Sequence, residues 1–259
     1  MPGWSEVELA GHGCSVFEPL EPSPHGYTLI YLHSVGLEDL RDCPGYAAQL
    51  QRRGLRMIAP RTGLSWWVDK VCDEFDPDVT AERYVADAVL PYIAERWGVR
   101  PPGIGLLGVS MGGQGALRLA YRKPSLFPVV AAVSPAVDFQ NWMTYGAAAF
   151  SGEEQRGREA SLWQMYGDPE RARQDTATLH VHPLNWPRNQ MFVCDPDDPW
   201  HESCDRLHMK LGSLGVPHEH DLETRAGGHS WDYFDAMAPR VFDFLVERLD
   251  AERRRQPTP

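Results

Sequence analysis

Short runs of apolar residues alternate along the chain with segments in which apolar residues recur every three or four positions. The runs, rich in β-branched and aromatic residues, predict buried strands, and the three-to-four spacing predicts amphipathic helices. The predicted strands span residues 27–33, 56–60, 103–110, 128–134, 189–195 and 217–224, and the predicted helices span residues 44–54, 80–98, 111–124, 200–215, 230–237 and 239–255. This alternation predicts an α/β fold with a mostly parallel, doubly wound sheet and helices on both faces.

Residue types near the helix ends support these boundaries. Thr80 is a typical N-cap, and Gly98 is typical of the position just after a helix. Pro91 should kink or split the 80–98 helix, because proline lacks the N–H that a helix interior uses. Pro239 is expected to begin the last helix.

Two segments fall outside the alternation. Residues 4–8 and 15–17 are expected to add antiparallel strands at one edge of the sheet. Residues 135–185 are rich in tryptophan, tyrosine, glycine and acidic residues, and predict an insertion of short helices that forms a lid or pocket wall near the active site. Because no repeat or linker interrupts the pattern, we predict a single domain over residues 1–259, with a frayed tail at 251–259.

Composition narrows the functional classes. The chain has 259 residues and a net charge of -11, without a basic stripe, which argues against nucleic acid and anionic membrane surfaces as partners. No apolar run approaches the roughly 20 residues that span a bilayer. The N-terminal residues lack the basic and apolar regions of a signal peptide, so a cytoplasmic protein is expected.

The cysteines and histidines give no metal-binding spacing. The five cysteines are scattered without a CxxC pair, which is typical of reduced thiols in a cytoplasm. His180 and His182 come nearest to a ligand pair, because that spacing would place both rings on one face of a strand. With no obvious third ligand nearby, we expect no metal and no organic cofactor.

Residues 108–112, where the strand at 103–110 passes directly into the helix at 111–124, read Gly-Val-Ser-Met-Gly. This is the G-x-S-x-G nucleophile elbow of α/β-hydrolases. Gly108 and Gly112 remove side chains that would collide across so sharp a turn, and the free N–H groups of the helix start face any anion formed beside Ser110. Ser110 is therefore the candidate nucleophile; the alternative is a glycine turn with a bystander serine.

A serine nucleophile needs a base, and the base needs an orienting acid, in the chain order serine, acid, histidine for this fold. His229 lies in a glycine-flanked loop after the last predicted strand, where such a fold gathers its site. The other histidines of this region, His201, His208, His218 and His220, fall on a predicted helix or strand. We predict His229 as the base; an ordinary surface-loop histidine is the alternative.

The acid has three candidates. Asp195, Asp197 and Asp198 lie at the end of the strand at 189–195, after its apolar run, and spacing alone does not choose among them. An Asp-Pro turn is an alternative role for this segment.

The segments GVSMGGQGAL and AGGHSW, with a strand followed by DPDD, resemble the esterase D family of α/β-hydrolases over roughly residues 27–250. That family includes S-formylglutathione hydrolases, feruloyl and acetyl-xylan esterases, and mycolyltransferases. Its members often carry Cys-Gly-x-x-Asp after this strand, with the last aspartate as the triad acid. The resemblance thus implies Asp198, with Asp197 next, although Asp195 stands here in place of the glycine.

An oxyanion at such a serine needs two N–H donors. One is expected from Met111, directly after the nucleophile. The resemblance implies that the other is the N–H of Val35, in the loop after the strand at 27–33. Relatives often have glycine where this chain has Ser34, whose hydroxyl is expected either to reshape the loop or to line the pocket.

The chain contains nine tryptophans, several of them in predicted loops at the rim. They predict an aromatic cleft suited to a hydrophobic or aromatic ester. The predicted pocket residues are Ser34, Trp66, Trp67, Trp142, Trp200 and Trp231. Core packing is the alternative for Trp66 and Trp67.

Together these features predict a serine carboxylesterase that cleaves small or aryl carboxylic esters through an acyl-enzyme, with a small-molecule ester as its partner. A thioesterase acting on S-formylglutathione and an acyltransferase are the nearest alternatives. A non-catalytic, ligand-binding relative is the alternative from a different class. A homodimer is left open.

Overall fold

The computed structural model describes residues 3–145 and 159–256, and its strands join one eight-stranded sheet in the order β1-β2-β4-β3-β5-β6-β7-β8. The strands are β1 (Trp4–Leu9), β2 (His12–Phe17), β3 (Thr28–Leu32), β4 (Arg56–Pro60), β5 (Ile104–Val109), β6 (Val129–Val133), β7 (Asn189–Val193) and β8 (Glu219–Asp221). β1 and β2 form an antiparallel edge, whereas the six strands β3 to β8 run parallel. The predicted α/β class, parallel sheet and antiparallel edge are confirmed.

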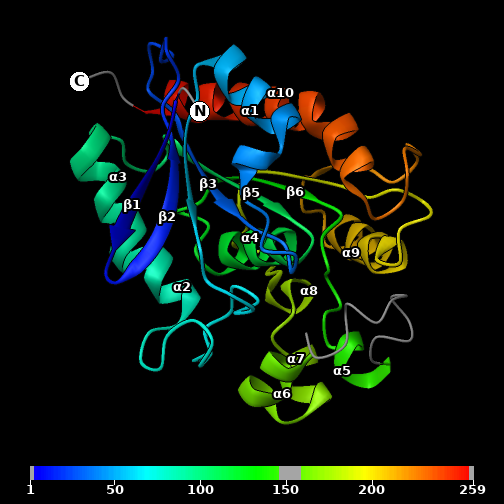
Figure 1. Ribbon diagram of the computed structural model, residues 1–259. Coiled ribbons are helices and arrows are strands. Elements are labelled where there is room, and N and C mark those ends of the chain that lie inside the picture. The colour runs from blue at the N-terminus through cyan, green and yellow to red at the C-terminus, as the bar shows by residue number, and fades with distance from the viewer. Residues whose placement is uncertain (1–2, 146–158, 257–259) are drawn as a thin grey trace.

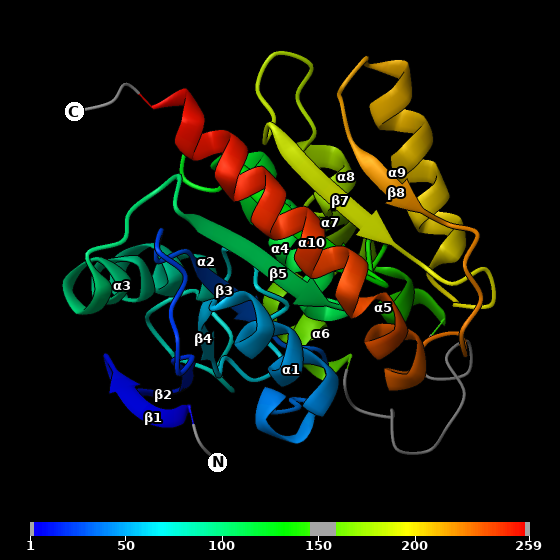
Figure 2. The ribbon, with the colours of Figure 1, turned by 90° about the horizontal axis from the view of Figure 1, so that it is seen from above.

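Helices cover both faces of the sheet (Figure 1, Figure 2). They are α1 (Pro44–Arg53), α2 (Ala81–Tyr84), α3 (Leu90–Trp97), α4 (Met111–Arg122), α5 (Asn141–Tyr145), α6 (Ala160–Tyr166), α7 (Pro169–Arg173), α8 (Ala177–His180), α9 (His201–Ser213) and α10 (Trp231–Arg255), with short 3-10 and π turns at Leu40–Asp42 and Val85–Val89. None of the described helices is long and apolar enough to cross a membrane.

Alternate residues of the central strands enter two separate cores. Ile30 and Leu32 of β3 belong to the core that contains residues of α4 and α9, while Leu29 and Tyr31 of the same strand belong to the core that contains residues of α1 and α10. Side chains of a strand point to opposite faces in turn, so a strand between two helical layers is apolar throughout. This is why the sequence of these strands reads as an unbroken apolar run.

The two prolines expected to shape helices, Pro91 and Pro239, behave differently from one another. At Pro91 the predicted interruption is present as a π-helical turn, Val85–Val89, in which the N–H of Leu90 bonds to the carbonyl of Val85. A widened turn accommodates the missing N–H and the bulk of the proline ring.

Pro239, predicted to begin a helix, instead lies inside the continuous helix α10. The apolar side of α10, from Tyr233 to Leu249, packs along one core, and this burial outweighs the proline's cost of about 3 kcal/mol. The predicted fraying also begins too early, because α10 continues to Arg255. Residues 257–259 of the predicted tail lie outside the described residues.

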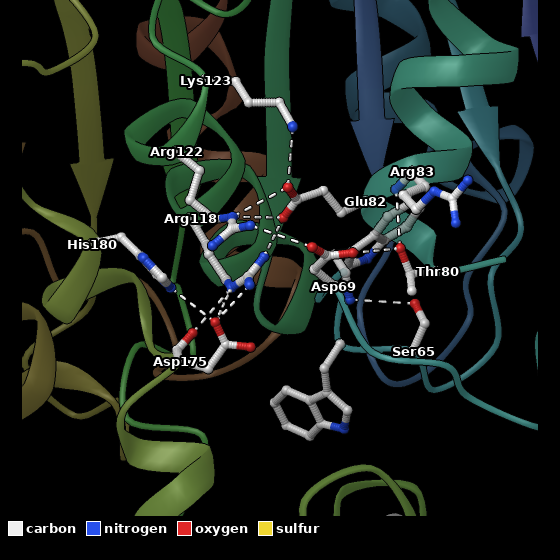
Figure 3. A network of polar contacts seen from close by, with 12 residues as sticks. Ser65, Asp69, Thr80, Glu82, Arg83, Arg118, Arg122, Lys123, Asp175 and His180 are labelled. Carbon is white, nitrogen blue, oxygen red and sulfur yellow. Dashed lines mark hydrogen bonds and ion pairs between the residues drawn. The ribbon is translucent and has the colours of Figure 1, made fainter.

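The insertion between β6 and β7 forms the short helices α5 to α8, as expected, with residues 146–158 outside the described part. Arg118 of α4, which is 1% exposed, joins this insertion to the body of the molecule. Its guanidinium donates to Glu82 of α2 at 2.6 Å and to Asp175 of the insertion at 2.5 Å. Figure 3 shows Arg118 between these two carboxylates, with Arg122 and Lys123 also facing Glu82.

Candidate active site

Three polar side chains meet at the carboxyl edge of the parallel strands. Ser110 follows β5, Asp198 follows β7, and His229 lies in the loop between β8 and α10. His229 Nε2 lies 3.0 Å from Ser110 Oγ, and His229 Nδ1 lies 2.7 Å from Asp198 Oδ2. The imidazole therefore bridges the hydroxyl and the carboxylate, and the three residues predicted from the sequence are connected through His229.

The turn at Ser110 depends on its flanking glycines. Ser110 has φ 53° and ψ -115°, a backbone conformation that is costly for a residue with a side chain. A Cβ on Gly108 would lie 2.0 Å from the carbonyl oxygen of Gly112, and a Cβ on Gly112 would lie 1.9 Å from that of Leu32. The N–H of Ser110 also bonds to Val133 O of β6 at 2.9 Å, which holds the turn against the neighbouring strand.

The aspartates after β7 differ in their surroundings. Asp198 is buried, and its Oδ1 accepts the N–H of Trp200 at 2.8 Å while Oδ2 faces His229. The Asp197 side chain is 67% exposed and pairs with Arg225. Between these two candidates, the structure places Asp198 against the imidazole.

Asp195, which stands in place of the family's glycine, has a role that the sequence did not reveal. Its buried carboxylate accepts the N–H groups of Ala226 at 2.6 Å and Gly228 at 3.0 Å, so it holds the loop that ends in His229. Burial raises the pKa of Asp195, but hydrogen bonds from the backbone of Ala226, Asp197 and Gly228 outweigh this, and the net pKa is lowered. The carboxylate therefore stays charged.

The histidine is open on one side. The His229 side chain keeps 28% of its surface exposed, whereas Ser110 is only 4% exposed. The Phe234 ring lies nearly perpendicular to the imidazole, with centroids 5.3 Å apart. A leaving group at the rim can therefore reach the imidazole while the serine remains shielded from bulk water.

The two predicted oxyanion donors lie in segments that adjoin one another. Met111 is the first residue of α4, where a backbone N–H has no carbonyl one turn earlier to bond to. Gly112 lies directly against the backbone of Leu32 and His33, so the loop that carries Val35 passes beside the start of α4. The helix dipole also favours negative charge at this end.

His33 fixes the loop after β3. The N–H of Thr62 donates to His33 Nε2 at 3.1 Å, so Nε2 carries no proton and Nδ1 donates to the Ser34 carbonyl at 2.9 Å. Burial lowers the pKa of His33, although its bond to Ser34 O partly opposes this. A neutral imidazole thus joins the loop to the segment after β4.

Ser34 contributes to loop structure. Its hydroxyl donates to Glu38 Oε2 and accepts the N–H of Gly36 at 3.0 Å, and the residue is 5% exposed. Of the two alternatives for Ser34, these contacts favour reshaping of the loop.

The prediction that Trp66 and Trp67 line the pocket is wrong, because both are fully buried. Their backbones adopt φ 53° and 55°, which turns the segment inward beneath α4. Trp67 Nε1 donates to the His33 carbonyl at 3.2 Å, and a Cβ on Gly115 would lie 2.4 Å from Trp67 Cβ. The alternative of core packing therefore holds, and this packing supports both α4 and the loop after β3.

The remaining predicted pocket tryptophans are also mostly covered. Trp142 is 6% exposed and packs on Trp66, and Trp200 is 2% exposed. Trp231, at the start of α10, is partly exposed and packs between Tyr46 and Phe234. An aromatic cleft built from all these indoles is therefore not formed.

The prediction that the rings of His180 and His182 share one face of a strand is also wrong. His180 is the last residue of α8, and its Nε2 contacts Asp175 at 2.8 Å. His182 lies beyond the helix, where its Nδ1 accepts the N–H of Leu184. The two rings belong to different local structures because the segment folds as a helix and a turn.

A parallel sheet carrying a serine elbow, with an acid and a histidine at the same rim, defines an α/β-hydrolase. The family described as "Putative esterase" matches residues 25–241 of this chain. The chain belongs to this family, which confirms the predicted esterase relationship and makes it a serine hydrolase that acts on ester bonds.

Individual relatives are distant. Diacylglycerol acyltransferase/mycolyltransferase Ag85B of Mycobacterium intracellulare is 23% identical over 284 residues, covering 95% of this chain and 83% of that protein. S-formylglutathione hydrolase of Mus musculus is 27% identical over 140 residues, covering 47% and 49%. The solved structure of FphF, a fluorophosphonate-binding serine hydrolase of Staphylococcus aureus, is similar with a TM-score of 0.75 at 15% identity, covering 94% and 97%.

Proposed function

We propose that this esterase is a carboxylesterase that cleaves small or aryl carboxylic esters, with Ser110 as nucleophile, His229 as general base and Asp198 as the acid that orients the base. The observation that carries the proposal is the continuous contact from hydroxyl to imidazole to carboxylate, at 3.0 Å and 2.7 Å. A serine hydroxyl alone is a weak nucleophile, and such a relay is what activates it.

In the acylation step, Ser110 Oγ attacks the ester carbonyl while His229 Nε2 takes the hydroxyl proton. The carbonyl oxygen becomes an oxyanion, which we assign to the N–H groups of Met111 and Val35. Each such donor contributes about 3 kcal/mol to lowering the barrier. His229 then gives its proton to the departing alkoxide, and the carbonyl re-forms as the acyl-enzyme.

In the second step, water attacks the acyl-enzyme with His229 again as base, and Ser110 leaves with a proton returned from the imidazole. Asp198 keeps its negative charge throughout and stabilises the imidazolium formed in each step. The burial of Asp198 and its bond from the Trp200 N–H support this role, because they fix the carboxylate in one orientation.

A second candidate is acyl transfer to an alcohol instead of water, which the similarity to Ag85B along 95% of this chain favours. The chemistry of acylation is the same, and only the acceptor differs. Adding a series of alcohols during turnover and measuring the ratio of new ester to free acid would separate the two. Turnover of S-formylglutathione against p-nitrophenyl acetate would similarly test a thioesterase.

The cellular setting and assembly are also proposals. The five cysteines are all free thiols, which supports a cytoplasmic location. A homodimer is the proposed alternative to a monomer, and light scattering of the purified chain distinguishes the two.

The proposed nucleophile is tested by Ser110→Ala in a p-nitrophenyl acetate assay. We expect kcat/KM to fall by at least about 10³-fold, because the variant has no atom to form the acyl-enzyme. Ser213→Ala is the matched control, since Ser213 is an exposed residue of α9 whose hydroxyl bonds only locally to Lys210 O. Full activity in Ser110→Ala would rule out this nucleophile.

A further inference from the structure

Three histidines outside the active site lie together beside the edge strand of the sheet. His208 belongs to α9, His220 belongs to β8, and His218 immediately precedes that strand. One ring nitrogen from each lies within 4.8 Å of the others. His208 Nδ1 is 2.8 Å from His218 Nε2, and the rings of His208 and His220 have centroids 3.9 Å apart.

One ring of this cluster is held in the protonation state that metal binding needs. His218 Nδ1 lies 2.9 Å from the carbonyl oxygen of Val216. A carbonyl only accepts, so Nδ1 carries the proton, and the lone pair of Nε2 accepts the N–H of His208 Nδ1, whose proton an ion would have to displace. A bond from the second ring nitrogen to a backbone carbonyl is the usual way in which proteins orient a metal-ligating histidine.

The imidazoles of the cluster also pack on a buried aromatic ring. The ring of Phe192 on β7 lies parallel to His218, with centroids 5.9 Å apart and an interplanar angle of 2°. Phe192 of β7 is paired with His220 of β8 in the sheet, so Phe192 and His220 belong to adjacent, hydrogen-bonded strands. The imidazoles are therefore supported from below by a buried side chain.

We propose that His208, His218 and His220 bind a divalent transition metal ion, with Zn²⁺ as the test case and the fourth position filled by water. Nitrogen ligands at about 2.0–2.1 Å from a tetrahedral ion stand roughly 3.4 Å apart. The ring nitrogens lie within 4.8 Å of one another, so the rings must adjust their positions for all three to reach that spacing. Three imidazoles without a carboxylate favour Zn²⁺, Ni²⁺ or Cu²⁺ over Mg²⁺ and Ca²⁺.

The position of this cluster suggests what the ion does. α9 starts at His201, three residues after Asp198, and β8 ends at Asp221, eight residues before His229. An ion held by both elements cross-links the helix that follows the acid to the strand that precedes the base. Because β8 is a three-residue edge strand, such a link stabilises the folded protein.

The test is isothermal titration of the metal-free, full-length protein with Zn²⁺, together with thermal unfolding. We expect one ion per chain and a higher Tm with Zn²⁺. His208→Ala and His220→Ala should each weaken binding at least about tenfold and remove the Tm shift, whereas His182→Ala, which removes an exposed histidine elsewhere, should change neither. Circular dichroism of the metal-free variants checks that they fold.

Co²⁺ provides a second readout that does not depend on stability. A tetrahedral Co²⁺ site gives a strong visible absorption, which we expect in the unmodified protein and in His182→Ala but not in His220→Ala. Binding that persists unchanged in both cluster variants, or no Zn²⁺ binding at all, would overturn the proposal. Esterase activity is not the readout, so the outcome is independent of the function proposed for Ser110.

Discussion

At the scale of single residues, neighbouring aspartates of one short segment have different tasks that follow from burial and partners. Asp195 is buried and accepts backbone N–H groups of the loop that carries His229. Asp197 is exposed and pairs with Arg225 on the surface. Asp198 is buried against the imidazole. A carboxylate stabilises an imidazolium strongly only where water is excluded, so Asp198 is the one suited to orient the base.

Asp198→Asn and Asp197→Asn form a matched pair that tests this assignment. Asp198→Asn should lower kcat on p-nitrophenyl acetate by about 10³–10⁴-fold, because an amide in place of the carboxylate favours the wrong tautomer of His229. Asp197→Asn should leave kcat nearly unchanged. Equal losses in the two variants would contradict the assignment, and circular dichroism would check that both are folded.

His33 links local protonation to global stability. Its folded pKa lies below the ordinary value of 6.5, chiefly through burial, so below that pH the unfolded chain binds a proton that the folded protein does not. The contribution of the neutral His33 ring to the free energy of unfolding is complete above about pH 6.5, and it declines as the pH falls toward the folded pKa. The slope is at most about 1.4 kcal/mol per pH unit.

His33→Gln, which keeps an acceptor for the Thr62 N–H, should remove this pH dependence. Urea unfolding at pH 7.5 and 5.5 would measure it. At pH 7.5 we expect the unmodified protein to have a larger free energy of unfolding than the variant. At pH 5.5 this difference between the two proteins should be smaller. A difference in free energy of unfolding that is the same at both pH values would contradict the neutral, buried imidazole.

At the scale of elements, the junction of β5 and α4 depends on glycines, because the lack of a Cβ lets the backbones approach closely. Gly112 lies against the carbonyl oxygens of Leu32 and His33, where an added Cβ would approach to 1.9 Å and 2.6 Å. Neither backbone can retreat easily, since β3 pairs with β5 and the His33 ring is bonded to Thr62. The same contact sets the relative position of the nucleophile and the loop that carries Val35.

Gly112→Ala should therefore destabilise the protein by about 1–3 kcal/mol or more and sharply reduce esterase activity. Gly212→Ala is the control, because Gly212 lies inside α9 with nothing within 4 Å of an added Cβ. That change should be neutral or stabilise by up to about 1 kcal/mol. Unfolding in urea measures both, and a Gly112→Ala variant of normal stability would contradict the tight junction.

Local sequence predicted most elements and the Ser110 elbow, because periodicity and glycine positions are local signals. Thr80 accepts the N–H of Arg83 as an N-cap, and Gly98 ends α3 in the left-handed region, as expected. Local signals failed where packing decides. The burial of Trp66 depends on left-handed backbone and on Phe139 and Trp142 from the distant insertion.

At the scale of the whole molecule, one buried cation connects three regions. Arg118 of α4 contacts Glu82 of α2 and Asp175 of the insertion, and His180 also bonds to Asp175 (Figure 3). The hydroxyl of Tyr166 donates to the same carboxylate. Charges taken out of water need partners, so each member depends on the others. Local sequence patterns do not predict such a network, because its members are far apart along the chain.

Arg118→Met should destabilise the protein by up to about 3–5 kcal/mol, because it removes the buried cation shared by Glu82 and Asp175 and leaves Glu82, 2% exposed, with the partly exposed Arg122 and Lys123. Arg83→Met is the matched control: Arg83 is 62% exposed and lies 3.8 Å from Asp87, so its loss should have little effect. Adding Glu82→Gln to Arg118→Met should recover part of the stability. Chemical denaturation compares all four proteins, and equal stabilities of the two single variants would contradict this network.

The most direct measurement of the central claim is peptide mapping by mass spectrometry after treating the folded protein with a fluorophosphonate probe. The account predicts one covalent adduct per chain, on Ser110, with much slower labelling in Asp198→Asn and none after heat denaturation. An unlabelled protein, or an adduct on a different serine while Ser110 remains unmodified, would contradict it.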